Sequence, residues 1–584
     1  MLPPVRRTMR SIVVLFALSL YGPLAGAQTT YYVSESIGSD VNPGTSPGAP
    51  WQTLFRVSAA ALSPGDQVLL KAGDTWLNDQ LVVTTSGVQG APIRFAAFGV
   101  GPRPVIDQMA ALPAVRASGA SDLIIETIHT RNGMDGIALH QCDRVLVSNC
   151  EIEAPSRYGV LGAGAPGLVT VESCDIHRCG VDGINAYITA FVVRNCYIHD
   201  LLNLSASSDA IALHDSYSPV SQIYGNTLVG PFNKAGISGA GVGAGAGANA
   251  TRYVAHANFV TGARKYGFII KALGSTGLVY NNIIVVPSFG MSPGAGLSAR
   301  ENALMEAYNN TVINLNTDDD GPSFHVASGA GITARNNISI CASNESLHWQ
   351  TSSTSAQMPS DHNLYWPDDD PLGLGGRFDL QGSTTTVTGW QALGHDPNAA
   401  VGHPLLLGGT MISRPDDARL GVTSPAIGSG EDLSAHFVVD FAGVTRPVGL
   451  AWDIGALKRS PSWGPLTLSI YQGAALDAHL EVNNGPASQP VVNFFSLDPL
   501  NTSSPGWGWL GGLHIPVADA VAFYNLGVLG IAPFGGVLDA TGHWSTLLPS
   551  AAIAGLSGLT LHGISAYDSA TGPVFTSVTS RLVQ

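Results

Sequence analysis

DGIALHQCDRVLVSNCEIEAPSRYGVLGAGAPGLVTVESCDIHRCGVDGINAY, residues 135–187, repeats itself at short range. It holds three variants of one hexad, DGIALH, YGVLGA and DGINAY, and two variants of one tetrad, NCEI and SCDI. Related tetrads recur with a spacing of about 22 to 32 residues. They are ETIH at 126, NCYI at 195, GNTL at 225, ANFV at 257, NNII at 281, NNTV at 309 and NNIS at 336. Each period contains short runs of alternating or β-branched residues broken by Gly or Asn, without a long helical pattern. This predicts an all-β chain of short strands coiled into a parallel β-helix.

One position of the tetrad changes from cysteine to asparagine along the chain. Cys150, Cys174 and Cys196 share this position, and asparagine then takes it over at residues 226, 258, 282, 310 and 337. In coils stacked in register, an inward asparagine can bond to the asparagines above and below. The sequence therefore predicts an asparagine ladder inside the β-helix.

The chain has 584 residues, a net charge of −15 and 45% hydrophobic residues, which indicates a globular protein of two or more domains. Arg6, Arg7 and Arg10 precede a short apolar run that ends in Ala25-Gly26-Ala27. This pattern predicts a signal peptide over residues 1–27 and a protein that is secreted or held at a bacterial cell surface. No later stretch is long and apolar enough to span a bilayer, so we expect no integral membrane segment after cleavage. Six cysteines are too few to form a disulfide scaffold in a chain of this length.

Several segments resemble the right-handed parallel β-helix proteins of the pectate-lyase-like superfamily. They are YYVSESIGSDVNPGTSPGAPWQTL at 31–54, LSPGDQVLLKAGDTW at 62–76, SPAIGSG at 424–430 and DFAGVTRPVGLAWDIGAL at 440–457. The resemblance spans about residues 30–458 and is specific for the fold, and less so for the reaction. It implies a β-helix domain over 28–459, which we expect to act as a monomer.

The chain after residue 459 differs in amino-acid composition from the β-helix region. SPSWGP at 460–465 is the expected linker, and residues 466–584 have few charges and many turns between short β-like runs. We expect a separate β-sandwich there. Its end is similar to C-terminal modules of large secreted bacterial proteins.

Aligned hexads place chemically active side chains in columns, because neighbouring rungs of a β-helix lie about 4.8 Å apart. The first positions of the hexads are Asp135, Tyr158, Asp182, Asp209, Ala235, Tyr266 and Ala295, and the last positions are His140, Ala163, Tyr187, His214, Ala240, Lys271 and Arg300. The last positions include proton-transfer and anion-binding side chains on adjacent rungs. Polar residues are also expected wherever a column end faces solvent, so for any single residue the simpler interpretation is a solvated side chain.

Asp182 and Asp209 would lie about 5 Å apart on neighbouring rungs, close enough to couple their titration or to share a cation such as calcium. Asp before Gly is also a common turn former, and Asp135 shows that this type recurs, so this alternative has equal weight.

The only basic strip of an otherwise acidic chain overlaps the last column. Residues 216–300 contain no Asp or Glu but six cationic residues: Lys234, Arg252, Arg264, Lys265, Lys271 and Arg300. Such a strip concentrates an anionic ligand. For an exported acidic protein this indicates an acidic polysaccharide and not nucleic acid. The candidate substrate-binding residues are Lys234, Arg264, Lys265 and Tyr266.

An elongated face suits a linear polymer, and cleavage of a uronate polymer by β-elimination needs a carboxylate partner, a base and an acid. The predicted partner is Arg300, the predicted base is Lys271, and the predicted acid is His214 or Tyr187. Lys271 and Arg300 resemble the lysine and arginine that the chondroitinase-B and alginate lyases of the β-helix class place on neighbouring coils. Those enzymes hold calcium beside the lysine with acidic ligands, and the absence of acids from 216–300 departs from that pattern. Asp182 and Asp209 could hold a metal on earlier rungs, or cationic side chains could replace it.

Two alternatives remain open. A hydrolase that resembles polygalacturonases would use Asp182 and Asp209 as acid and base, although the usual paired-aspartate motif of that family is absent. The other alternative is a carbohydrate-binding or adhesion protein without catalytic activity, anchored by the C-terminal module.

Overall fold

The computed structural model describes most of the chain. The described residues are 28–459 (without 110, 165–166, 188, 203–206, 216–217, 242–249, 287–293, 317–320, 342–345, 368–375, 407–408, 411 and 422), 467–472, 478–483, 488–497, 517–539, 543–549, 553, 560–569, 572–575 and 579–582. The predicted signal peptide, 1–27, and the predicted linker, 460–465, lie outside these residues.

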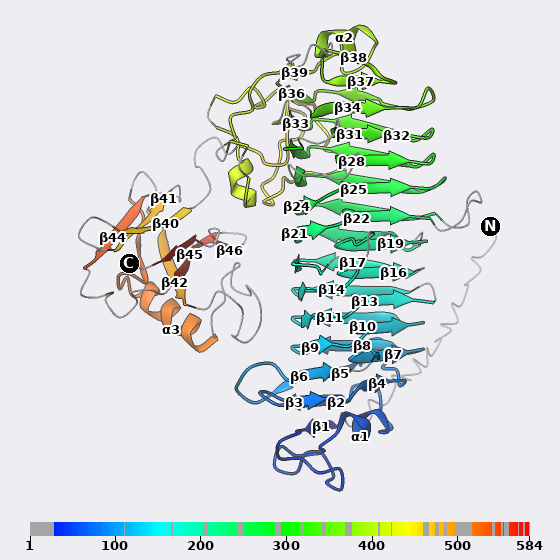
Figure 1. Ribbon diagram of the computed structural model, residues 1–584. Helices are drawn as coiled ribbons and strands as arrows, with labels where there is room; N and C mark the ends of the chain where they lie inside the picture. The colour runs from blue at the N-terminus through cyan, green and yellow to red at the C-terminus, as the bar shows by residue number, and fades with distance from the viewer. Residues whose placement is uncertain are drawn as a thin grey trace, which may run out of the picture.

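Three long sheets form a parallel β-helix, and each coil adds one strand to every sheet in chain order (Figure 1). Sheet A consists of β1 (Thr30–Val33), β2 (Gln67–Lys71), β5 (Ile93–Phe98), β8 (Ser121–Glu126), β11 (Asp143–Ser148), β14 (Leu168–Glu172), β17 (Ala190–Arg194), β20 (Ser221–Tyr224), β23 (Arg252–His256), β26 (Thr276–Tyr280), β29 (Leu304–Tyr308), β32 (Gly331–Arg335) and β35 (Ser360–Asp361).

Sheet B consists of β3 (Thr75–Leu77), β6 (Val105–Gln108), β9 (His129–Asn132), β12 (Glu151–Glu153), β15 (Asp175–His177), β18 (Tyr197–His199), β21 (Thr227–Phe232), β24 (Phe259–Ala263), β27 (Ile283–Val286), β30 (Thr311–Asn314), β33 (Ile338–Cys341), β36 (Leu364–Trp366) and β39 (Ala400–Val401). Sheet C consists of β4 (Leu81–Val83), β7 (Val115–Ser118), β10 (Asp135–His140), β13 (Tyr158–Ala163), β16 (Ile184–Tyr187), β19 (Ile211–His214), β22 (Ala235–Ala240), β25 (Tyr266–Lys271), β28 (Ala295–Arg300), β31 (Pro322–Val326), β34 (Leu347–Thr351), β37 (Phe378–Leu380) and the antiparallel β38 (Ser383–Thr385).

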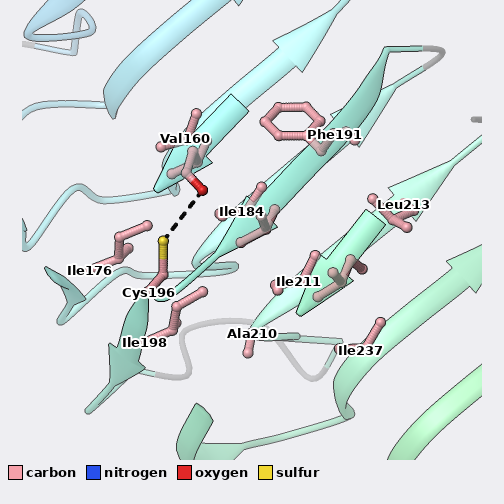
Figure 2. Packing of buried hydrophobic residues seen from close by; sticks show 14 of the residues in the cluster. Val160, Ile176, Ile184, Phe191, Cys196, Ile198, Ala210, Ile211, Leu213 and Ile237 are labelled. Carbon is pink, nitrogen blue, oxygen red and sulfur yellow. Dashed lines mark hydrogen bonds between the residues drawn. The ribbon is translucent and has the colours of Figure 1, made fainter. Parts of the chain in front are cut away.

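Stacked apolar side chains fill the space between the three sheets. One column of sheet C runs through Val160, Ile184, Ile211 and Ile237, which are paired directly from rung to rung and fully buried (Figure 2). Because strand side chains alternate between faces, burial of this set sends the intervening residues to the outer face. The interior thus fixes which residues each rung presents outside.

The predicted asparagine ladder is confirmed. The side-chain Oδ1 of Asn258 accepts from the backbone N of Asn226 at 3.2 Å, and the same contact joins Asn258 to Asn282 at 3.0 Å. It continues through Asn310, Asn337 and Asn363, and the last carboxamide donates from Nδ2 to the buried carboxylate of Asp396 at 2.7 Å. Each carboxamide also donates to a backbone carbonyl of the preceding coil, as at Asn282 Nδ2 to Ala255 O, 2.9 Å. Buried backbone groups at this turn are thereby satisfied.

The six cysteines are all free and buried. Cys150, Cys174 and Cys196 precede the asparagines in the same stack, and the backbone N of Cys196 donates to Asn226 Oδ1 at 3.0 Å. The thiols thus occupy the position that the sequence assigns to them.

Three helices and a long irregular segment cover parts of the coil. α1 (Leu54–Ser58), α2 (Val387–Ala392) and the 3-10 helix η1 (Pro415–Ala418) are all short. The segment 402–459 packs apolar side chains such as Leu406 and Ile454 against Ile313 and Ile338 of sheet B. The buried guanidinium of Arg446 donates to the carbonyls of Asp453 and Gly455 and so ties this segment together. No helix of the described residues is long and apolar enough to cross a bilayer.

The C-terminal region contains two small antiparallel sheets and a helix. One sheet is β40 (Thr467–Gln472), β41 (Ala478–Asn483) and β44 (Trp544–Leu548), and the other is β42 (Pro490–Ser496), β43 (Gly535–Val537), β45 (Thr560–Ser569), β46 (Gly572–Phe575) and β47 (Thr579–Leu582). Buried side chains of both sheets, among them Leu480 and Val491, form one cluster. The helix α3 (Val517–Val528) was not predicted. The sandwich architecture itself stays a prediction.

Candidate active site

The last column of hexads lies in one register, as predicted. Tyr187 pairs with His214 across β16 and β19, His214 with Ala240, Ala240 with Lys271 and Lys271 with Arg300 across β25 and β28. In β25, Phe268 and Ile270 belong to the interior cluster, so alternation places Lys271 on the outer face. We name Tyr187, His214, Ala240, Lys271 and Arg300 the terminal column.

Tyr187 and His214 form a stacked pair at one end of this column. Their ring centroids lie 4.8 Å apart, and the Tyr187 side chain is 40% exposed. Burial, together with the charges of Lys234 and Lys271, lowers the pKa of His214 to about 4. The imidazole is therefore neutral at pH 7, and its buried Nδ1 has no hydrogen-bond partner among the described residues. A neutral ring with an open nitrogen can accept a proton but cannot act as the acid at this pH.

Lys271 and Arg300 occupy the other end of the column, half-buried on adjacent rungs. Arg300 Nη1 donates to the Tyr266 hydroxyl at 2.9 Å, and its Nε has no hydrogen-bond partner in the described part of the chain. The guanidinium is thus held from one side and retains donors for a carboxylate. Tyr266, predicted to bind substrate, is only 2% exposed, and what it contacts is Arg300.

The predicted pair of aspartates is present and buried, and Lys234 joins it. The backbone N of Asp209 donates to Asp182 Oδ1 at 2.8 Å, and Lys234 Nζ lies 2.7 Å from Asp209 Oδ2. Lys234 also donates to Ser238 Oγ at 2.9 Å. Burial and the neighbouring Asp209 carboxylate raise the pKa of Asp182 to about 7. Burial also raises the pKa of Asp209, an effect that Lys234 opposes.

Calcium does not fit this pair in the observed arrangement. Besides the two contacts above, Asp182 Oδ2 accepts from Asn185 Nδ2 at 2.7 Å and Asp209 Oδ1 accepts from the backbone N of Ala235 at 2.8 Å. Each of the four carboxylate oxygens therefore has a protein donor, and one donor is a cation. Calcium requires six to eight oxygen ligands. The carboxylate oxygens of the pair could bind calcium only if they gave up their present hydrogen bonds. The predicted metal role of Asp182 and Asp209 remains a prediction.

The other predicted substrate-binding cations lie at the turn between β24 and β25. Arg264 Nη1 donates to Asn233 Oδ1 at 3.1 Å, and Lys265 Nζ lies 5.9 Å from the centre of the Tyr266 ring. Lys265 thus lies beside Tyr266, Arg264 is bound to Asn233, and the ammonium of Lys234 is engaged by Asp209 and Ser238.

A second column of the outer face was missed. Ser238, Ile269, Ser298, His325, Gln350 and Asp379 pair from rung to rung, two residues before the terminal column. His325, Gln350 and Asp379 line a hollow of about 370 Å³. Ser298 Oγ lies 3.0 Å from His325 Nδ1, and burial together with Arg300 lowers the pKa of His325 to about 4. The hexad PSFHVA at 322–327 continues the repeat, but Ser323 stands where most hexads have glycine, which hides this hexad in the sequence.

A family model described as "Right handed beta helix region" matches residues 111–258. The chain contains a right-handed parallel β-helix. The matched region includes Tyr187 and His214 of the terminal column, whereas Lys271 and Arg300 lie beyond it.

Other comparisons return carbohydrate-active proteins. The chain is 48% identical over 75 residues to a lacto-N-biosidase of Bifidobacterium longum subsp. longum. The aligned stretch covers 12% of this chain and 5% of that protein. Among solved structures, a pectate lyase Pel9A has 18% identity over 74% of this chain and 97% of its own, with a TM-score of 0.42. A lacto-N-biosidase of Eubacterium ramulus has 16% identity over 58% of this chain and 63% of its own, with a TM-score of 0.33. An alginate lyase of Paenibacillus sp. str. FPU-7 has 15% identity over 61% of this chain and 99% of its own, with a TM-score of 0.32.

Proposed function

We propose that this protein is a secreted bacterial polysaccharide lyase that cleaves a uronic-acid-containing polymer by β-elimination on the outer face of sheet C. The observation that supports the proposal is the terminal column, which sets Lys271 and Arg300 side by side and in register with Tyr187 and His214. A linear polymer lying along the column would meet these groups in sequence.

The reaction needs only side chains of this column and water. Arg300 binds the uronate carboxylate, which makes the C5 proton more acidic. Lys271 removes that proton, the C4–O bond breaks, and a double bond forms between C4 and C5. The departing oxygen takes up a proton from water, and the proton on Lys271 is released to water, which resets the site. Tyr187, the predicted acid, lies three rungs from Lys271, about 14 Å, so its hydroxyl can supply a proton to the departing oxygen only through water. Because the imidazole of His214 is neutral at pH 7, Tyr187 fits the acid role better than His214.

A glycoside hydrolase that uses Asp182 and Asp209 is the second candidate. The specific observation in its favour is the raised pKa of Asp182, which keeps a large fraction of this carboxyl protonated at pH 7, as a general acid requires. The local match to a lacto-N-biosidase also supports a hydrolase. Against it, both carboxylates are buried and hydrogen-bonded to the protein. A hydrolase requires both to reach the glycosidic bond.

One assay separates the candidates. Alginate, pectate, chondroitin sulfate, dermatan sulfate and a lacto-N-biose glycoside are incubated with the protein, with and without a chelator. Elimination produces an unsaturated sugar that absorbs in the ultraviolet, hydrolysis releases reducing ends without this absorbance, and a binding protein does neither.

The variants Lys271→Ala and Arg300→Gln should abolish the ultraviolet product. Arg252→Gln is the matched control, since Arg252 belongs to the same basic strip but lies in β23 of sheet A. Asp182→Asn should leave elimination intact and would abolish hydrolysis. Absence of an unsaturated product on every uronate polymer would refute the lyase proposal.

A further inference from the structure

A second cluster of titratable side chains lies on sheet B, away from the terminal column. β12 presents Glu151 and Glu153 on its outer face, with Ile152 between them in the interior. His129 of β9 pairs in register with Glu151, and His177 of β15 pairs in register with Glu153. Two glutamates of one rung are therefore flanked by an imidazole from the rung before and one from the rung after.

The four side chains converge diagonally. His129 Nε2 lies 3.2 Å from Glu153 Oε2 and 3.8 Å from Glu151 Oε1. His177 Nε2 lies 3.6 Å from the same Glu151 Oε1. One donor atom each of His129, Glu151 and Glu153 can be chosen so that all three lie within 4.8 Å of one another. Ligand atoms of a tetrahedral zinc site, at bond lengths of 2.0–2.2 Å, lie about 3.3–3.6 Å apart, which is close to the distances from His129 to the two glutamates. His177 lies outside this group of three and approaches only Glu151.

Two arginines orient the glutamates from outside. Arg103 Nη1 lies 3.5 Å from Glu151 Oε2, and Arg178 Nη1 lies 3.0 Å from Glu153 Oε1. In both glutamates the arginine contacts one oxygen, and the other oxygen is the one closest to the imidazoles. Partners of this kind position the ligands in metal sites.

The imidazole nearest the centre is not satisfied by the protein alone. His129 Nε2 is buried and makes no hydrogen bond of acceptable geometry with any described residue, although two carboxylates lie close to it. Imidazole nitrogen excludes calcium as the natural occupant, because calcium takes oxygen ligands, and it favours zinc.

We propose that His129, Glu151 and Glu153 form a binding site for a divalent transition metal of the zinc class, which links two successive coils, with His177 of the next coil beside it. The site is independent of the proposed lyase activity, and the metal takes no part in that reaction. Its role is to clamp β9 and β12 together.

The test uses the full chain after treatment with a chelator and removal of the chelator by buffer exchange. Zinc is titrated by calorimetry, and the melting temperature is measured with and without zinc, because a ligand of the native state stabilises it by mass action. Cobalt replaces zinc in a second titration, because tetrahedral cobalt absorbs strongly in the visible range. We expect saturable binding of one ion, a higher melting temperature with zinc and a strong cobalt band.

Variants locate the ion. His129→Gln and Glu153→Gln should each raise the Kd for zinc by more than about 100-fold, and Arg178→Ala by about 10- to 100-fold. The matched control is His256→Gln, which replaces a histidine of β23 in sheet A that stacks on Tyr224 and Tyr280. Circular dichroism and the melting temperature of each variant without metal establish that it folds. Absence of zinc binding to the wild type, or equal affinity in a double variant without His129 and His177, would overturn the proposal.

Discussion

Replacement of Asn282 by alanine should destabilise the β-helix by about 3 kcal/mol. Its carboxamide donates to Ala255 O, Tyr280 O and Asn310 Oδ1, and accepts from both the backbone N and Nδ2 of Asn258. Without it, the buried N–H of Asn258 has no acceptor, which costs about 1–3 kcal/mol. The remaining contacts and the small void left by the carboxamide add a similar amount.

Guanidinium unfolding followed by circular dichroism measures the change in free energy, and hydrogen exchange locates it. The backbone amide of Asn258 should lose protection, whereas that of Asn226 should keep it, because its acceptor Asn258 Oδ1 is still present. Gln222→Ala, a half-buried outward position of β20, is the control and should change stability by less than about 0.5 kcal/mol. A loss below about 1 kcal/mol for Asn282→Ala, with unchanged exchange at Asn258, would refute the stabilising role of the ladder.

Three further outcomes are expected. Tyr266→Phe removes the hydroxyl that holds Arg300, a hydrogen bond to a charged group, so the KM for a uronate polymer should rise about 10-fold with a smaller change in kcat, as measured by ultraviolet product. Burial raises the pKa of Asp396 from 3.8 to about 6. The group therefore stabilises the fold below about pH 4, and this contribution, on the order of 3 kcal/mol, is lost as the pH rises to about 6. In Asp396→Asn, the unfolding free energy should change less with pH over this range. Gly267→Ala would place a methyl group 2.5 Å from Ile284 Cγ2 and 2.6 Å from the carbonyl oxygen of Gly296, and denaturant unfolding should show a loss of about 1–3 kcal/mol.

The coil and its columns could be predicted because the same residue types recur at the same positions. Cys174 and Asn282 occupy equivalent places, and a hexad ending in Lys271 aligns with one ending in Arg300. Once the register is known, alternation decides which residues face outward. This is why the terminal column was found without any structure.

Contacts between different positions of the repeat could not be predicted in the same way. Lys234 precedes its hexad, and nothing in its sequence neighbourhood shows that it bonds to Asp209 on the previous rung. The hydroxyl of Tyr266, at the first position of its hexad, reaches Arg300 at the last position of the next hexad. The helix α3 follows no repeat, and the short β-like runs around it predict only strands. Such features depend on side-chain reach and local packing, which a column alignment does not encode.

The asparagine ladder gives the β-helix a chemical direction. Every carboxamide from Asn226 to Asn363 accepts from the coil before it and donates to the coil after it, and the series ends on a carboxylate, which only accepts when ionised. Coils within this series are interchangeable parts, so a whole coil could be inserted or deleted there without leaving a mismatched neighbour. A coil transplanted among Cys150, Cys174 and Cys196 would meet a thiol, a weak acceptor, on one side. Lengthening or shortening of the solenoid by gain or loss of a coil is therefore easier in its later half. Every coil gained or lost between Asn258 and Asn310 would change the spacing of the side chains along the outer face by one rung.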